Sequence, residues 1–241
     1  MLRENKPWRS IYEDRLSDEP IEGSLTEFLK DAVDKYQNNV ALTQDERTVT
    51  YGELWELSGK CAAALSEAGV RKGDRVGLML PNCPEYVIGF FGAVRIGAAA
   101  TQVNPIYVGR ELEHIFDNSE TETVIVHAAM YGKVKTIQSD TPLRRVICVG
   151  EPEGGLEDDD VSFDEFIESA SGDVPEVGIE PREDLASIQY TGGTTGVSKG
   201  AMLTHANLLG GIQQTIDLLI EDPSNFPENG KVIAIAPLFH I

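Results

Sequence analysis

RVGLMLPNCPEYVIGFFGAVRIGAAATQV, residues 75–103, is the stretch of sequence that decides the fold. Apolar runs at 75–80 and 98–103 predict buried strands, and residues 85–96 between them have helical spacing. Such a strand–helix–strand unit joins parallel strands of one sheet. The alternation continues, with helices predicted at 110–118, near 131–137 and from about 206, and strands at 123–128, 145–150, 185–190, near 201–204 and at 231–236. We therefore predict an α/β fold in which parallel or mixed sheets are flanked by helices.

The chain before residue 75 has clear helix starts. Two capping boxes, Ser24 with Glu27 and Thr50 with Glu53, each predict the beginning of a helix. Two short strands are expected between these helices, at 40–43 and 48–50, and a third cap at Ser162 predicts a short helix later in the chain. Residues 1–23 are charged and aperiodic, so we expect an arm on the surface.

The composition excludes several classes of protein. Of the 241 residues, 41% are hydrophobic, which supports a packed core and excludes wholesale disorder. No apolar run approaches the roughly 20 residues of a membrane span, and residues 1–16 lack the apolar core of a secretory signal. The three cysteines fit no disulfide framework or zinc spacing, so we expect a reduced, cytoplasmic protein; they are Cys61, Cys83 and Cys148. Cys61 lies on an apolar helix stripe and is interpreted as a core residue.

The charge is strongly negative. The chain has 40 acidic residues against 20 basic ones, a formal net charge of −20. Nucleic acid is therefore not expected as a partner, because a phosphate backbone needs clustered Lys and Arg. The simplest interpretation is a solvated surface with one disordered acidic loop at Glu151–Asp160. The excess is nevertheless larger than the charge of about 2–8 that keeps a small domain soluble. Because salt screens such repulsion, a salt-rich cytoplasm is a second hypothesis.

The segment most informative about function is YTGGTTGVSKG, residues 190–200. Its glycines allow positive φ angles, so that backbone N–H groups can surround an anion. Threonine hydroxyls can donate to phosphate oxygens or bind a hard cation such as Mg²⁺. Lys199 adds a positive charge that can reach a β- or γ-phosphate. In so acidic a chain, this concentration of donors predicts a polyphosphate ligand.

Two better-known phosphate motifs do not fit this loop. A Walker A loop needs Gly-Lys-Ser/Thr, whereas here Ser198 precedes Lys199 and Gly200 follows it. No G-x-G-x-x-G pattern opens a helix after the first strand, so a dinucleotide-binding fold has no support. A flexible loop of turn-forming residues remains the alternative on composition alone.

The sequence from Tyr190 to Leu208, YTGGTTGVSKGAMLTHANL, resembles the phosphate-loop signature of the adenylate-forming (AMP-binding) acyl-CoA synthetases. Within that superfamily it is most similar to long-chain fatty-acid–CoA ligases. Other segments resemble the family in the same order: TYGEL (50–54), GDRV (73–76), LPN (80–82), GA (97–98), VNP (103–105) and PLFH (237–240). The resemblance covers nearly the whole chain and implies the first part of the large N-terminal domain of such an enzyme.

The resemblance implies a reaction in two steps. A carboxylate attacks the α-phosphate of ATP to give acyl-AMP and pyrophosphate, and the thiol of CoA then takes the acyl group. ATP, Mg²⁺ and CoA are thus the implied cofactors and co-substrates, and the partners are small molecules. The residues implied to hold the β- and γ-phosphates are Thr191, Gly192, Gly193, Thr194, Thr195, Gly196 and Lys199. Ser198 stands where many relatives carry proline, which we expect to loosen the loop without removing donors.

Several parts of the family's site are not found in this sequence. Relatives are about twice as long, and the Tyr-Gly-x-Thr-Glu segment, the ribose-binding aspartate and the small C-terminal domain have no match here. We therefore expect residues 24–241 to be a partial AMP-binding domain, the C-terminal domain to be absent, and the catalytic residues to lie beyond Ile241. We expect a truncated protein or a gene fragment, and we expect this chain to be inactive on its own. Peripheral membrane contact and a homodimer are left open for the full-length protein.

The four histidines lie in different sequence contexts. By resemblance His240 borders the acyl and CoA channel; the alternative is an exposed strand end. His205 is interpreted as structural, as a cap of the helix that follows it. His114 and His127 have no partner spacing and are expected on a helix face and in a strand. Tyr86, Phe90 and Phe91 follow helical spacing, which favours the core over a cofactor stack.

Three functions remain open on the sequence. The first is a fatty-acid–CoA ligase, incomplete in this chain. The second is another adenylate-forming enzyme, either an aryl-CoA ligase or the adenylation domain of a peptide synthetase. The third is a non-catalytic nucleotide-binding protein that keeps the loop alone. Only the sequence of the loop favours fatty acids, since by resemblance residues beyond Ile241 largely determine which acid is bound.

Overall fold

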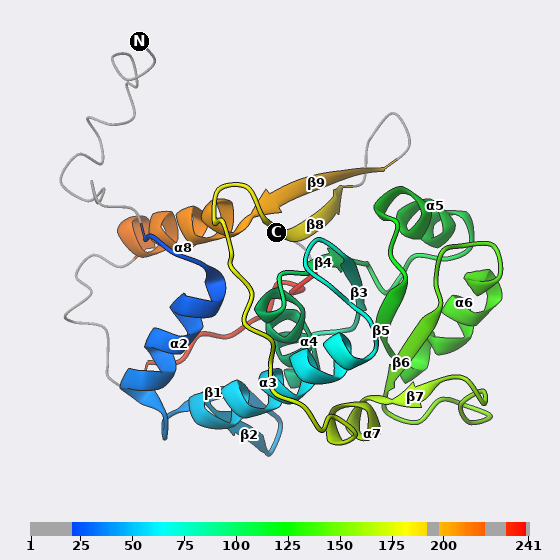
Figure 1. Cartoon of the computed structure of the whole chain (residues 1–241), viewed down its shortest axis with the longest axis horizontal. Coiled ribbons are helices and arrows are strands. Elements are labelled where there is room, and N and C mark those ends of the chain that lie inside the picture. The colour runs from blue at the N-terminus through cyan, green and yellow to red at the C-terminus, as the bar shows by residue number, and fades with distance from the viewer. Residues whose placement is uncertain (1–20, 192–197, 220–229, 240–241) are drawn as a thin grey trace, which may run out of the picture.

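The computed structural model describes residues 21–191, 198–219 and 230–239 of the chain. At its centre is a seven-stranded sheet with the order β7-β6-β5-β3-β4-β8-β9 (Figure 1). Neighbouring strands run parallel except for β8 and β9, which are antiparallel. This arrangement confirms the predicted α/β fold. The strands are β3 (Arg75–Met79), β4 (Ala99–Gln102), β5 (Thr123–His127), β6 (Arg145–Val149), β7 (Val161–Ser162), β8 (Leu185–Thr191) and β9 (Lys199–Thr204).

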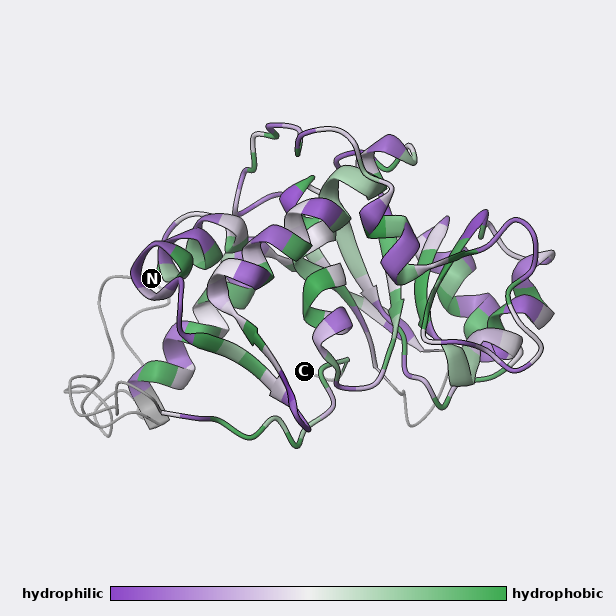
Figure 2. Ribbon diagram, turned by 90° about the horizontal axis from the view of Figure 1, so that it is seen from below, coloured by the Kyte–Doolittle hydropathy of each residue, from purple (hydrophilic) through white to green (hydrophobic). Residues whose placement is uncertain are grey.

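Helices cover both faces of this sheet. Successive side chains of a strand point to opposite faces, so Val124 and Val126 pack on one side and Ile125 on the other. The first face is covered by α5 (Arg110–Ser119) and α6 (Ala128–Gln138), and the second by α3 (Tyr51–Glu67), α4 (Pro84–Arg95) and α7 (Phe163–Glu168). In Figure 2 the helices mix hydrophobic and hydrophilic stretches, as expected for elements that are apolar on one side only.

The predicted helix starts are confirmed. Both capping boxes are formed, at the beginnings of α2 (Leu25–Tyr36) and α3, and the Ser162 hydroxyl accepts from the Glu165 N–H at α7. Between α2 and α3 lies the antiparallel hairpin of β1 (Val40–Gln44) and β2 (Arg47–Thr50). Cys61 is fully buried in the core, as predicted. It touches α4 at Gly92, where a Cβ atom would lie 2.6 Å from the Cys61 sulfur, so only glycine permits this approach.

One predicted strand is wrong. Residues 231–236 (red in Figure 1) have no ladder partner among the described residues, and the side chains of Val232, Ile233 and Ile235 are exposed. An apolar run shows only that the residues favour a strand, whereas a strand also needs a neighbouring strand with a free edge to pair with. Other boundaries shift by a few residues: β9 begins at Lys199, and α8 (His205–Leu219) begins one residue before its expected start.

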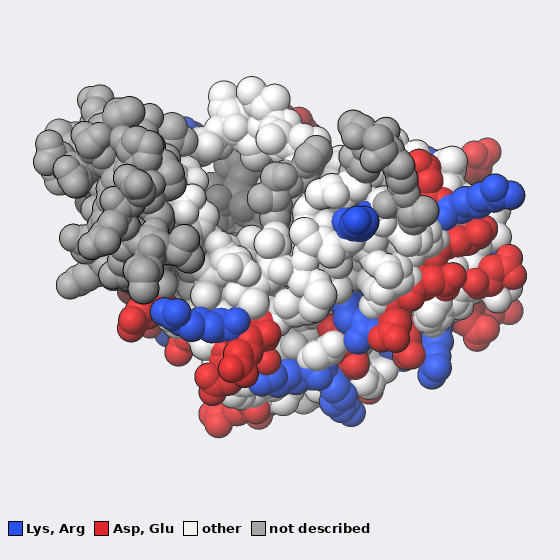
Figure 3. Space-filling model, turned by 90° about the horizontal axis from the view of Figure 1, so that it is seen from above, with Lys and Arg blue, Asp and Glu red and all other residues white. Residues whose placement is uncertain are grey.

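The acidic run is also more ordered than expected. The hydroxyl of Tyr131 donates to the Asp160 carboxylate at 2.6 Å, and Lys135 pairs with Glu157 at 3.1 Å and with Asp160 at 2.8 Å. The interpretation of Glu151–Asp160 as a disordered loop is therefore wrong, although Asp158 and Asp159 are exposed. On the face shown in Figure 3, charged side chains gather along the lower and right-hand edges, and the middle is largely uncharged.

Candidate functional site

The glycine-rich segment connects two antiparallel strands. Thr191 ends β8 and Lys199 begins β9, and these two residues face each other in register. Since β8 runs parallel to β4, the loop lies at the carboxyl edge of the parallel strands, where open α/β sheets bind their ligands. Thr191 and Lys199 are both exposed there. The other predicted phosphate-binding residues, Gly192, Gly193, Thr194, Thr195 and Gly196, lie outside the described residues.

The base of the loop is closed by a serine. The hydroxyl of Ser198 donates to the carbonyl of Thr191 at 2.6 Å and so joins the two ends of the loop. The sequence predicted that a serine in place of proline would loosen the loop, but at its base the hydroxyl adds a bond. One residue further, a Cβ atom at Gly200 would lie 2.8 Å from the Ile188 side chain. Glycine at this position therefore lets the Ile188 side chain lie against β9.

A second contact at the loop base comes from His114 in α5. Its Nε2 lies 2.7 Å from the Ser198 carbonyl, and because a carbonyl only accepts, Nε2 carries the hydrogen. The imidazole also makes an edge-on contact with the Tyr190 ring, with centroids 6.2 Å apart. Sequence reasoning placed His114 on a helix face, which is correct, but missed this contact. No residue spacing predicts this contact, because His114 and Ser198 are 84 residues apart and only the order of the strands in the sheet brings them together.

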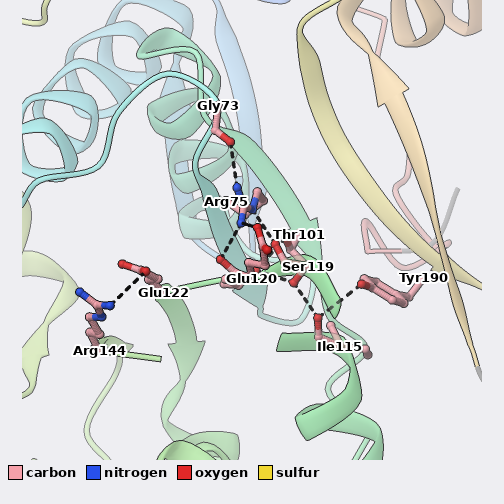
Figure 4. A network of polar contacts seen from close by, with 10 residues as sticks. Gly73, Arg75, Thr101, Ile115, Ser119, Glu120, Glu122, Arg144 and Tyr190 are labelled. Carbon is pink, nitrogen blue, oxygen red and sulfur yellow. Dashed lines mark hydrogen bonds and ion pairs between the residues drawn. The ribbon is translucent and has the colours of Figure 1, made fainter. Parts of the chain in front are cut away.

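The helix that carries His114 is itself fixed by polar contacts at its carboxyl end (Figure 4). The guanidinium of Arg75 donates to the carbonyls of Ser119 at 2.5 Å and Glu120 at 3.0 Å. The Ser119 hydroxyl in turn donates to the Ile115 carbonyl at 2.6 Å. On the other side the Tyr190 hydroxyl donates to the Asn118 side chain at 2.7 Å, and burial raises the pKa of Tyr190. The end of β8 is thus held to α5 immediately before the loop.

The PLFH segment reaches the same edge of the sheet. The Tyr86 hydroxyl donates to the Leu238 carbonyl at 2.9 Å, and the Gln189 amide donates to the Phe239 carbonyl at 2.5 Å. Gln189 precedes Thr191 by two residues, so Phe239 lies close to the base of the loop. Tyr86 is buried as predicted, but its hydroxyl also has this positioning contact. His240 itself lies outside the described residues.

Comparison with known proteins decides the family. Residues 29–241 match the family described as AMP-binding enzyme. The chain belongs to this AMP-binding family. The curated relatives include 4-coumarate–CoA ligase 1 of Solanum tuberosum, 37% identical over 82% of this chain, and the long-chain-fatty-acid–CoA ligase of Salmonella typhimurium, 32% identical over 90%. These matches cover 35% and 43% of the two relatives, so the AMP-binding chain spans less than half of their length.

Solved structures agree with this assignment. A long-chain-fatty-acid–CoA ligase from Archaeoglobus fulgidus aligns with a TM-score of 0.76 at 31% identity, covering 93% of this chain and 44% of that one. An anthranilate–CoA ligase, solved with anthranoyl-AMP, aligns with a TM-score of 0.70 at 28% identity, covering 78% and 36%. The similarity therefore extends to ligases of both fatty and aromatic acids.

Two further histidines of the AMP-binding chain have structural contacts. His205 is buried, and its Nδ1 accepts from the Leu25 N–H at 3.2 Å. It therefore caps α2, whereas the sequence predicted a cap of the following helix; Thr204 accepts from the Asn207 N–H at that helix instead. Burial lowers the pKa of His205, although the nearby carboxylates of Asp184 and Glu27 favour its charged form. His127 ends β5, as expected, and its Nδ1 accepts from the Ala129 N–H at the start of α6.

The three cysteines of the AMP-binding chain have free thiols with raised pKa values. Burial raises the pKa of the Cys61 thiol to about 12 and those of Cys83 and Cys148 to about 11, so all three are neutral thiols at pH 7. Within the described part of the chain, no three His, Cys, Asp or Glu side chains form a group that could hold a metal ion. None of the described helices is long and apolar enough to cross a membrane.

Proposed function

We propose that this chain is the phosphate-holding part of an ATP-dependent acyl-CoA ligase, which forms acyl-AMP and then acyl-CoA. The observation that carries the proposal is the hairpin base, where Thr191 and Lys199 face each other at the carboxyl edge of the sheet. A hydroxyl and a mobile positive charge there would hold the β- and γ-phosphates while the carboxylate attacks. We assign the same role to Gly192, Gly193, Thr194, Thr195 and Gly196, which lie outside the described residues.

The chain's own residues would act on the phosphates by orientation and charge. The contacts of Ser198 with Thr191 and of His114 with Ser198 fix the loop's base before ATP arrives, so less reorganisation is needed in the transition state. Bound Mg²⁺ would neutralise charge on the phosphate oxygens. Among the described residues, the exposed Thr191 hydroxyl fits this ion as an oxygen ligand, with phosphate and water oxygens completing its shell.

For the acid substrate we propose a fatty acid. The Salmonella typhimurium fatty-acid ligase aligns over 90% of this chain and the Solanum tuberosum 4-coumarate ligase over 82%. In structure, the Archaeoglobus fulgidus fatty-acid ligase aligns over 93% and the anthranilate ligase over 78%, although a fatty acyl CoA synthetase of Mycobacterium tuberculosis aligns over only 76%. The alternatives are an aromatic acid, supported by the higher identity of 37%, and the adenylation domain of a peptide synthetase. We assign His240 to the wall of the acyl channel, because Phe239 is held beside the loop.

We further propose that residues 24–241 are the first part of the AMP-binding domain, and that residues 1–23 form an arm. The groups that bind adenine and ribose, and the C-terminal lysine, are then supplied by chain outside these 241 residues. On this proposal the 241-residue chain binds pyrophosphate but does not make acyl-AMP. A non-catalytic protein that keeps the loop alone is the alternative of a different class.

The net charge of −20 supports a further proposal, that the protein works in a salt-rich cytoplasm. Screening shortens the range of repulsion to about 3 Å at 1 M salt, which favours the compact state of so acidic a chain. The membrane contact and the homodimer that the sequence left open receive no support from the described residues.

The test is a titration of the 241-residue chain with magnesium pyrophosphate, followed by calorimetry, beside an ATP–pyrophosphate exchange assay. We expect binding that Lys199→Ala weakens, and no exchange with any acid by this chain. In a longer protein that contains the chain, exchange should depend on a fatty acid and not on 4-coumarate. Exchange that depends on 4-coumarate alone would favour the aromatic-acid alternative. No binding of pyrophosphate at millimolar concentrations would remove the phosphate assignment.

A further inference from the structure

We propose that Asn82 is a positioning residue that holds residues 234–239 beside the phosphate-loop hairpin. The proposal rests on the proposed function for its chemical meaning, because this segment affects the acid substrate only if it borders the acid channel. The geometry of the contact stands independently of that function.

The side chain of Asn82 contacts three alternate residues of this segment. Its Nδ2 donates to the carbonyls of Ala234 and Ala236, both at 2.9 Å. Its Oδ1 accepts from the Leu238 N–H at 2.7 Å. The backbone turns within this segment, where the Ile235 N–H donates to the Ile233 carbonyl at 3.0 Å. One side-chain amide therefore binds three backbone groups of residues 234–238, using its two hydrogens and its oxygen.

The segment has few other contacts. Residues 231–237 are exposed, and the side chain of Val232 keeps 84% of its surface accessible. Within the described part of the chain, no strand pairs with residues 231–236. The remaining side-chain bonds come at its end, from Tyr86 to Leu238 and from Gln189 to Phe239. Asn82 is thus the residue that fixes the segment before Pro237.

Asn82 itself lies between two regular elements of the fold. It follows β3 and precedes α4, and its own carbonyl accepts from the Gln44 side chain at 3.1 Å. Gln189, which holds the other end of the segment, lies in β8 two residues before Thr191. Since β3 and β8 lie on either side of β4, the segment crosses the carboxyl edge of the sheet from one strand to the other. The path of residues 234–239 along this edge is then set by two side-chain amides, those of Asn82 and Gln189.

The functional consequence is specific to the acid substrate. If Asn82 is lost, Ala234 and Ala236 lose their bonds to it and Leu238 keeps only its contact with Tyr86, while Thr191 and Lys199 keep their own contacts. A displacement of about 1 Å at a substrate wall can cost up to about 100-fold in rate. We therefore expect Asn82→Ala to raise KM for the acid by about 10- to 100-fold and to leave KM for ATP within about twofold.

The experiment compares three variants of the 241-residue chain by hydrogen exchange of the peptide over residues 230–239. Asn82→Ala removes both the donor and the acceptor, whereas Asn82→Asp keeps an acceptor for the Leu238 N–H. Gln44→Ala is the matched control, because it touches Asn82 but none of residues 231–239. We expect the Leu238 amide to exchange at least about 10-fold faster in Asn82→Ala, and within about threefold of the unchanged chain in the other two.

Unchanged exchange in Asn82→Ala overturns the proposal. If Asn82→Ala also loosens β3 and β5, Asn82→Asp decides: slow exchange at Leu238 supports the contact, and fast exchange overturns it. In a longer, active protein, a rise of KM for ATP equal to that for the acid overturns the positioning role. A longer protein without adenylation activity but with the expected exchange pattern would contradict the proposed function and leave the contact intact.

Discussion

Replacing Asp160 with asparagine should destabilise the fold much more than the same change at its neighbours. The side chain of Asp160 is 1% exposed and accepts from Tyr131 at 2.6 Å and from Lys135 at 2.8 Å. Asparagine keeps the shape but leaves Lys135, itself 14% exposed, paired only with Glu157, which is 64% exposed. Removing one partner of a buried pair costs about 3–5 kcal/mol. Because the contact of Lys135 with Glu157 remains, we expect the free energy of unfolding to fall by about 3 kcal/mol.

For a chain of this size, 1 kcal/mol shifts Tm by about 2–4 °C, so Asp160→Asn should lower Tm by about 6–12 °C. The matched control is Asp159→Asn, which removes the same charge from an exposed side chain and should change stability by no more than about 0.5 kcal/mol. Urea unfolding of both variants, in dilute buffer and in 1 M KCl, measures the difference. If the two variants unfold at the same midpoint, the acidic run acts only as a solvated patch and the reasoning fails.

Three further predictions follow from the charges and contacts. In an active, longer protein, Lys199→Ala should lower catalytic efficiency for ATP by about 10- to 150-fold, because it removes one charge-assisted hydrogen bond, and should leave KM for the acid unchanged. Steady-state kinetics in which KM for the acid rises and the efficiency for ATP is unchanged would refute the phosphate role. Burial lowers the pKa of His205 below its usual value of about 6.5, so as the pH falls the unfolded chain binds a proton at His205 before the folded chain does. The urea midpoint should therefore fall as the pH drops below 6.5, and it should fall less steeply in His205→Gln. The same dependence of the midpoint on pH in both proteins contradicts this. Tm should rise steeply from dilute buffer to about 1 M KCl, and a flat response contradicts the proposed salt-rich habitat.

Most of the fold was predictable because the sheet is buried on both faces. Its strands are short apolar runs, such as RVICVG, and the capping boxes mark where helices begin. The strand β7 was missed, since two residues carry no periodicity. The run KVIAIA was assigned wrongly for a different reason: it is a clear apolar run, but a strand also requires a neighbouring strand to pair with, which a local pattern does not report.

The candidate site was predictable only in its loop. The residue types and spacing of Lys199 and the threonines predict phosphate binding. His114 and Asn82 do not, because their contacts join residues 84 and 156 positions apart in the chain. Neither residue carries a local signal, and both contact backbone groups, which are identical at every position. Only the order of the strands brings them to the carboxyl edge of the sheet.

That order also explains why the loop is rich in threonine. A Walker A loop leads directly into a helix, whose N-terminus helps to bind phosphate. Here the chain leaves the loop as β9, and the next helix begins only at His205. Six strand residues at about 3.3 Å each place that helix end about 20 Å from the base of the loop. The helix dipole acts only near the end of a helix, so it cannot serve a ligand at the loop. On the proposed function, the negative charge of the phosphates is therefore met by the backbone N–H groups of the loop, hydroxyl donors, Lys199 and bound Mg²⁺.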